Sequence, residues 1–251
     1  MRKLSVALAV AAAVLASGAT ADAGSDGRPL EAAADRTAAL PSVRFAVVAR
    51  FTNGKNEMAL HVRGASADHG NSIRVHLKVE DVRLGDGTLL RGPVMDEVLD
   101  GGYVYLRTPL LGSVLDRGSW VRVRALRTGS RSPILRPIRQ AGVAPIYNLL
   151  RVARAVVPAG TGSYRATLDP ADAIVQSALQ GLSGGTEFRR LGLTARLDAD
   201  GLVRSVRIVG RGVDGSRFTV TARLYDLGGR VRIVPPPPGQ VLAKELLGTE
   251  M

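Results

Sequence analysis

The chain has 251 residues, no cysteine and a formal net charge of +12, with 34 lysine and arginine residues against 22 aspartate and glutamate residues. The lack of cysteine excludes disulfide staples and acylation at a cysteine, so a folded domain must rely on its apolar core. The many arginines fit the codon usage of a GC-rich genome or attraction to an anionic partner. Nucleic acid is not expected as that partner, because we find no basic helix and too few aromatic residues for a base-stacking platform.

The first residues are organised like a secretory signal peptide. Arg2 and Lys3 precede an apolar run over 4–15, and small residues around Ala21 and Ala23 fit a cleavage site. The run is about 12 residues, whereas a membrane-spanning helix needs about 20, so we favour a removed signal over a membrane anchor. We expect a secreted protein of the cell envelope. The predicted divisions are a signal peptide over 1–23, an N-terminal segment with a short helix over 24–42, one folded domain over 43–234, and a proline-rich turn and tail over 235–251.

Alternation of apolar and polar residues dominates the first half of the domain and predicts half-buried strands. A short alanine-rich helix over 30–40 comes first and ends at Pro41. In the strand that follows, Phe45 and Val47 lie on one face while Arg44 and Arg50 lie on the other. The predicted strands of this half are 43–51, 58–62, 73–79, 89–99, 103–107 and 120–126.

The middle of the chain changes character before the alternation returns. An irregular, proline-containing connection over 127–145 leads to a helical pattern over 146–157, and a second helix is predicted to begin at Asp169 with Pro170 in its first turn. The later strands are predicted at 164–168, 191–197, 202–208, 218–224 and 231–233, with a helical tail over 241–248. Strands before and after a helical middle indicate an α+β fold with one large antiparallel sheet, apolar on one face and arginine-rich on the other.

Two glycine motifs do not point to an enzyme. Residues 181–185 match G-x-S-x-G, but that nucleophile motif follows a strand and needs a histidine, whereas here a predicted helix precedes it and no histidine follows His76. Residues 210–215 match G-x-G-x-x-G, but a predicted strand follows where a dinucleotide site needs a helix. We interpret the first as the end of a helix and the second as a hairpin loop.

Candidate metal ligands are equally incomplete. Residues 198–201 begin like a calcium loop, but Val203 and Ser205 occupy later ligand positions and no glutamate takes the twelfth. His61 and His76 lie at outward positions of two predicted strands, and a zinc site there lacks a third ligand. We therefore assign no catalytic residue, no metal and no cofactor, and we expect a protein that is not an enzyme.

Several segments, taken in order, resemble the actinobacterial LppX/LprG-type envelope lipoproteins, which are relatives in fold of the LolA lipoprotein carriers. The matching segments in this sequence are 104–107 (VYLR), 109–111 (PLL), 120–123 (WVRV), 164–169 (YRATLD), 197–201 (LDADG) with Arg204 and Val206, and 225–229 (YDLGG) before a proline cluster. The resemblance covers most of the chain after the signal peptide. Members of that family are typically acylated at a cysteine, and this chain has none, so the resemblance does not extend to membrane tethering.

The resemblance implies an open antiparallel β half-barrel whose concave face is covered by helices, with an apolar cavity for the acyl chains of a lipid or glycolipid. A lipid chain needs no special motif, since each buried CH₂ contributes about 0.8 kcal/mol. The apolar faces of the predicted strands and helices supply the candidate lipid-binding residues. They are Phe45, Val47, Phe51, Leu60, Val75, Leu77, Leu149, Val152, Ile174, Ala178, Leu179, Leu193, Val206, Phe218 and Val220.

For each of these residues, ordinary core packing is the alternative interpretation. Tyr103, Tyr105 and Trp120 are interpreted either as the mouth of a cavity or as residues that stiffen the sheet. For the whole protein, the alternative is an envelope interaction module without a ligand, which docks an anionic membrane, wall polymer or protein through its basic face. Peripheral contact with an anionic membrane fits either hypothesis. The sequence sets no oligomeric state.

Overall fold

The computed structural model of the chain describes residues 28–54, 56–80, 82–83, 87, 89–90, 92, 94–109, 119–124, 143–183 and 187–242. The predicted signal peptide, most of the predicted 127–145 connection and most of the predicted helical tail lie outside the described residues. The statements below concern the described part of the chain.

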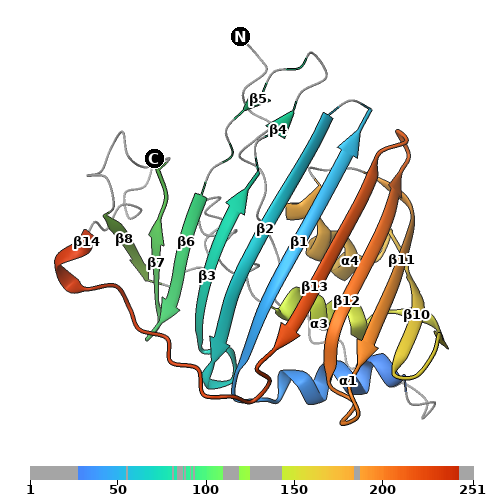
Figure 1. Ribbon diagram of the computed structural model, residues 1–251, viewed down its shortest axis with the longest axis horizontal. Coiled ribbons are helices and arrows are strands. Elements are labelled where there is room, and N and C mark those ends of the chain that lie inside the picture. The colour runs from blue at the N-terminus through green and yellow to red at the C-terminus, as the bar shows by residue number, and fades with distance from the viewer. Residues whose placement is uncertain are drawn as a thin grey trace.

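All of the described strands belong to one sheet (Figure 1). Its main path runs in the order β14-β8-β7-β6-β3-β2-β1-β13-β12-β11-β10-β9. Off this path, the short strand β4 pairs with β2, and β5 pairs with β4. Neighbours on this path are antiparallel except for β14 and β8, which are parallel. The strands are β1 (Val43–Asn53), β2 (Asn56–Ala67), β3 (Ser72–Val79), β4 (Val82–Arg83), β5 (Leu89–Leu90), β6 (Val94–Asp100), β7 (Tyr103–Arg107), β8 (Trp120–Arg124), β9 (Arg154–Pro158), β10 (Ser163–Leu168), β11 (Phe188–Leu197), β12 (Val203–Gly212), β13 (Arg217–Tyr225) and β14 (Val241–Leu242).

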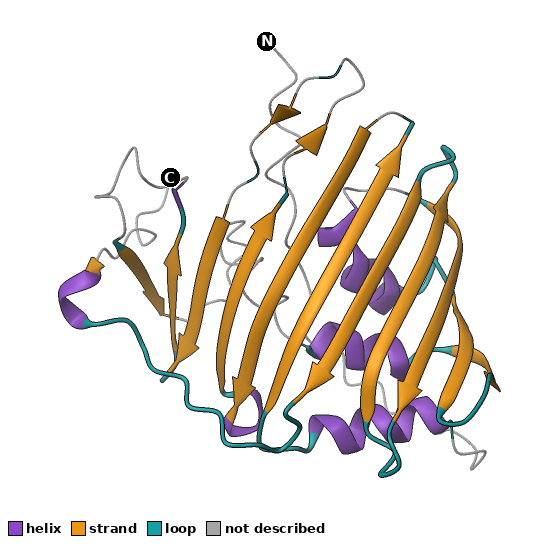
Figure 2. Cartoon of the chain, in the orientation of Figure 1, coloured by secondary structure: helices purple, strands orange, loops and turns teal. Residues whose placement is uncertain are grey.

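Three α-helices of the described chain pack on one side of this sheet, behind β1 and the strands from β13 to β10 in the view of Figures 1 and 2. They are α1 (Pro29–Ala38), α3 (Ala144–Arg151) and α4 (Ala173–Ser183). We call the sheet face toward the helices the inner face and the opposite one the outer face. The open antiparallel sheet with helices on one face is the α+β half-barrel that we predicted.

Local interactions of α1 fix it against the sheet. Pro29 begins the helix, where a missing N–H costs nothing because the first turn has no partner for it. Near its other end, the buried Thr37 hydroxyl donates to the Ala33 carbonyl oxygen at 2.7 Å and accepts from the Val203 N–H at 2.9 Å. Arg151 of α3 reaches the Asp35 carboxylate at 2.8 Å. Thus α1 is bound both to β12 and to the neighbouring helix.

The prediction of a helix over 146–157 is wrong in its second half. The helix α3 ends at Arg151, and β9 begins at Arg154 and pairs with β10. The apolar residues at 156 and 157 fit a helical period, but β-branched valines also suit a strand, and the edge of β10 offers hydrogen bonds that a longer helix would forgo. Tertiary pairing therefore decides the conformation here.

Four other elements differ from the predictions. The Asp169 carboxylate binds the Ala171 N–H at 2.9 Å within a turn, whereas Asp172 caps α4 by accepting from the Ile174 N–H at 2.8 Å. The predicted strand 89–99 is divided between β5 and β6. The predicted strand 231–233 is absent, because β13 already lies between β1 and β12 and has no free edge of its own with which the next segment could pair. Residues 241–242 form β14 rather than the start of a helix.

Candidate functional site

The predicted lipid-binding residues lie together between the sheet and the helices, with one exception. Most are buried members of a single apolar cluster, and Phe51, Leu77 and Val152 are half-buried against it. The buried ones are Phe45, Val47, Leu60, Val75, Leu149, Ala178, Leu179, Leu193, Val206, Phe218 and Val220. Ile174 is the exception: it is 39% exposed in the first turn of α4 and lies outside the cluster. Its neighbour Val175 is the residue that faces the core.

The cluster is most tightly packed beneath the helices. Phe45 and Phe218, on β1 and β13, are fully buried, and the Phe188 ring lies 5.4 Å from that of Phe218. Gly64 on β2 lies opposite Phe45, and a side chain there would collide with the Phe45 ring. This part of the inner face has the close packing of an ordinary core.

Parts of the inner face on β3 and β6 are less covered. Ile73, Leu77 and Val79 of β3 are half-buried and pack against the edge of the main cluster. Met95 and Leu99 of β6, which lie opposite Leu77 and Ile73, are also half-buried. None of the helices α1, α3 and α4 lies behind these strands in Figure 1. Accessible apolar side chains therefore continue outward from the core along the same face.

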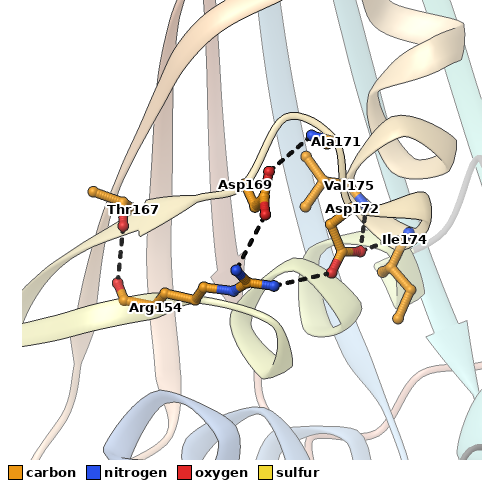
Figure 3. Close-up of polar contacts among 7 residues, drawn as sticks. All are labelled: Arg154, Thr167, Asp169, Ala171, Asp172, Ile174 and Val175. Carbon is orange, nitrogen blue, oxygen red and sulfur yellow. Dashed lines mark hydrogen bonds and ion pairs between the residues drawn. The ribbon is translucent and has the colours of Figure 1, made fainter.

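The position of α4, which supplies one wall of the cluster, is fixed by a polar clamp (Figure 3). The Arg154 guanidinium of β9 lies 3.1 Å from an Asp169 carboxylate oxygen and 4.0 Å from one of Asp172. Asp172 in turn caps α4 through the Ile174 and Val175 N–H groups. Thr167 donates from β10 to the Arg154 carbonyl oxygen at 3.3 Å. One arginine thus joins the edge of the sheet to the start of the helix.

A buried acid interrupts the apolar inner face. Glu97 of β6 pairs in register with Val75 and Leu106, so it shares their face of the sheet. It is only 2% exposed, and its Oε2 atom has no hydrogen-bond partner among the described residues. Burial raises the pKa of its carboxyl to about 8, so the group is mostly protonated at neutral pH.

The sequence analysis did not single out Glu97, although a signal was present. Asp96 and Glu97 are adjacent in a strand, and adjacent strand residues point to opposite faces. One of the two acids therefore had to face inward. Tyr147 of α3 was also missed: its buried hydroxyl has no partner among the described residues, and burial raises its pKa above the ordinary value against an opposing effect of Arg151.

On the outer face, the neighbouring acid is fully engaged. Asp96 accepts from Arg107 at 2.8 Å and lies 2.8 Å from the Nδ1 atom of His76. Burial raises the pKa of the Asp96 carboxyl, but the hydrogen bonds from His76 and Arg107 outweigh it and hold that pKa below its ordinary value. His61 has its own carboxylate, Glu80, at 2.6 Å. The two histidines, on the adjacent strands β2 and β3, thus pair with separate acids.

The aromatic residues proposed for a cavity mouth lie on the outer face. Trp120 and Tyr103 occupy the same side as Arg107 by register, and the Arg107 guanidinium lies 4.7 Å from the Trp120 ring centroid. Arg122 similarly lies 5.0 Å from the Tyr103 ring. The cation–π contacts hold Trp120 and Tyr103 against neighbouring arginines of the sheet, as the interpretation of sheet-stiffening residues expects.

Arginines gather on the outer face over β1 and the strands from β13 to β10. Arg190, Arg211 and Arg217 lie directly opposite one another across β11, β12 and β13. Like charges in such positions destabilise a sheet. The exposed arginines of this region without an ion pair among the described residues are Arg50, Arg165, Arg190, Arg196, Arg207, Arg211, Arg217 and Arg223.

The remaining motifs have the structural roles that we expected. Ser183 of the G-x-S-x-G motif is the last residue of α4, and residues 210–215 include the turn between β12 and β13. Asp198 closes the turn before β12 by accepting from the Leu202 N–H at 2.9 Å and pairing with Arg204. Within the described residues, no three acidic or histidine side chains gather as a metal site, and no helix is long and apolar enough to cross a membrane.

Two solved structures have a similar course of the chain. LprF from Mycobacterium bovis matches with 16% sequence identity and a TM-score of 0.45, over 83% of this chain and 95% of that one. The lipoprotein LppX from Mycobacterium tuberculosis matches with 12% identity and a TM-score of 0.43, over 84% of this chain and 100% of that one. No protein-family model and no curated protein matches the chain. At these identities and TM-scores the matches carry no weight of their own, and the fold rests on the sheet and helices described above.

Proposed function

We propose that this protein binds the acyl chains of a lipid or glycolipid against the inner face of its sheet and carries them between layers of the cell envelope, without catalysis. The observation that carries the proposal is the continuity of half-buried apolar residues, Phe51, Leu77 and Val79, with the buried core beneath the helices. An acyl chain laid along this face would extend the core. A peripheral contact with the membrane would deliver the lipid.

The energetics favour such a ligand without any dedicated chemical group. At about 0.8 kcal/mol for each buried CH₂, a chain of about 16 carbons offers on the order of 12 kcal/mol before the costs of ordering and association. Those costs leave a smaller net affinity. The proposal therefore needs only an apolar surface that admits the chain, which Leu77 and its half-buried neighbours supply.

The first experiment is native mass spectrometry of the protein purified from its own host, followed by organic extraction of any adduct. We expect a stoichiometric acyl lipid. An unliganded mass together with no uptake of added lipids would contradict the proposal. The matched variants are Leu77→Asp, which places a charge on the inner face, and Lys78→Asp, which places the same charge next to it on the exposed outer face. Leu77→Asp should lose lipid uptake while Lys78→Asp keeps it.

The opposed arginines on the outer face favour a second candidate function, an interaction module that docks an anionic membrane. Arg190, Arg211 and Arg217 repel one another across the sheet. Attraction to the anionic phosphates of a membrane would offset this repulsion. Vesicle co-sedimentation tests this function, with neutral vesicles beside anionic ones. Arg211→Gln together with Arg217→Gln should weaken binding to anionic vesicles, and added salt should do the same. Equal binding of both vesicle types would contradict membrane docking through charge.

A further inference from the structure

Among the described strands, one acidic side chain lies on the inner face, and its neighbours in register are apolar. A single row across the sheet runs through Phe45 of β1, Gly64 of β2, Val75 of β3, Glu97 of β6 and Leu106 of β7. Glu97 is therefore a direct continuation of the row that begins in the core at Phe45. Met95 and Leu99, two positions before and after Glu97 on β6, face the same side and are apolar too.

Buried carboxyl groups in folded proteins almost always have hydrogen-bond partners, because an unpaired one loses its hydration without compensation. Asp96 obeys this rule on the outer face, where Arg107 and His76 both bind it. Glu97 does not: its Oε2 atom is unpartnered among the described residues although the side chain is 2% exposed. The contrast between adjacent residues indicates that the Glu97 carboxyl is available to a partner from outside the described residues.

We propose that Glu97 is the polar recognition point of the lipid-binding face, where its buried carboxyl forms a hydrogen bond with a hydroxyl group of an uncharged lipid. This inference rests on the proposed function and deepens it, because it names the ligand class: a neutral acyl lipid that bears a hydroxyl near its ester, such as an acylglycerol. An ordinary core position would not select a hydrophilic side chain between Val75 and Leu106.

The protonation state of Glu97 suits this ligand class. Burial raises its pKa to about 8, so at neutral pH the group is mostly a carboxylic acid with one O–H donor and a carbonyl acceptor. A lipid hydroxyl can donate to the acceptor, and an ester carbonyl can accept from the donor. An ionised fatty acid or fully ionised phosphate offers no donor to the Glu97 carbonyl oxygen, and its charge would repel the carboxylate whenever Glu97 is ionised.

The experiment compares the affinities of two esters of one acyl chain, 1-lauroylglycerol and methyl laurate. Each ester displaces a fluorescent fatty-acyl probe from the full-length folded protein. The variants are Glu97→Leu, which removes the polar group, and Glu97→Gln, which keeps a donor and an acceptor. Asp96→Asn is the matched control, because it removes a carboxylate one residue away on the other face. Circular dichroism and thermal melting verify that each variant is folded.

We expect the wild-type protein to prefer 1-lauroylglycerol, and Glu97→Leu to reduce that preference by about tenfold, as the loss of one buried hydrogen bond implies. Glu97→Gln should retain most of the preference, and Asp96→Asn all of it. Equal preference in the wild type and Glu97→Leu, with both esters still bound, would overturn the inference alone. Failure of the wild type to bind either ester would overturn the proposed function, and the inference with it.

Discussion

The inner face of this sheet has two regions that share the alternation of apolar residues but differ in how completely their side chains are buried. Beneath the helices, around Phe45 and Phe218, the side chains are fully buried and the face is a closed core. On β3 and β6 the same alternation continues, but Leu77 and Met95 remain half-buried and Glu97 replaces an apolar residue. The difference indicates that the first region holds the fold together, whereas the second is packed less completely.

The largest effect should come from truncating the closed region. We expect Phe218→Ala to lower the free energy of unfolding by about 3–5 kcal/mol, because it leaves a cavity under the helices. Leu77→Ala, in the half-buried region, should cost only about 1–2 kcal/mol, since part of its surface already meets solvent. Urea denaturation of both variants measures the difference. Equal costs would mean that the two regions are packed alike.

The next effect concerns the pH dependence that Glu97 confers. Its pKa rises from 4.5 to about 8 on folding, so the folded state holds a proton that the unfolded state releases between these values. Its contribution to stability is therefore full below pH 4.5 and falls as the pH rises toward 8, by at most about 1.4 kcal/mol per pH unit. Glu97→Leu should remove this slope and raise stability at pH 8.

The measurement is chemical denaturation of the wild type and Glu97→Leu at several pH values from 5 to 9, compared as a difference so that other titrating groups cancel. Asp96→Asn serves as the control, because the Asp96 carboxyl has its pKa held low and should not contribute in this range. A slope that persists in Glu97→Leu would show that Glu97 is not the buried titrating group, and would weaken the contrast between the two regions.

The smallest expected effect is at Tyr147, whose buried hydroxyl also has no partner among the described residues. Tyr147→Phe removes an unsatisfied hydroxyl from the apolar cluster and should change the free energy of unfolding by less than about 1 kcal/mol, toward higher stability. Thermal melting measures it. A loss of about 2 kcal/mol or more would mean that the hydroxyl has a partner and that the closed region contains a polar contact.

The local patterns of the sequence determined much of this fold. The alternation in 43–51, 73–79 and 218–224 predicted the strands and which of their residues would be buried, because a period of two assigns each side chain to a face. All of the candidate residues except Ile174 then gathered against one cluster. The turn residues at 210–215 likewise predicted the hairpin between β12 and β13. Such signals are local, so a single sequence suffices to read them.

Tertiary structure decided the rest. Residues 154–158 became a strand because the edge of β10 was open, and 231–233 did not because β13 was enclosed on both sides. Only the register of β3, β6 and β7 placed Glu97 between Val75 and Leu106, and set Arg211 against two other arginines. Pairing between distant segments carries this information, and no local periodicity contains it.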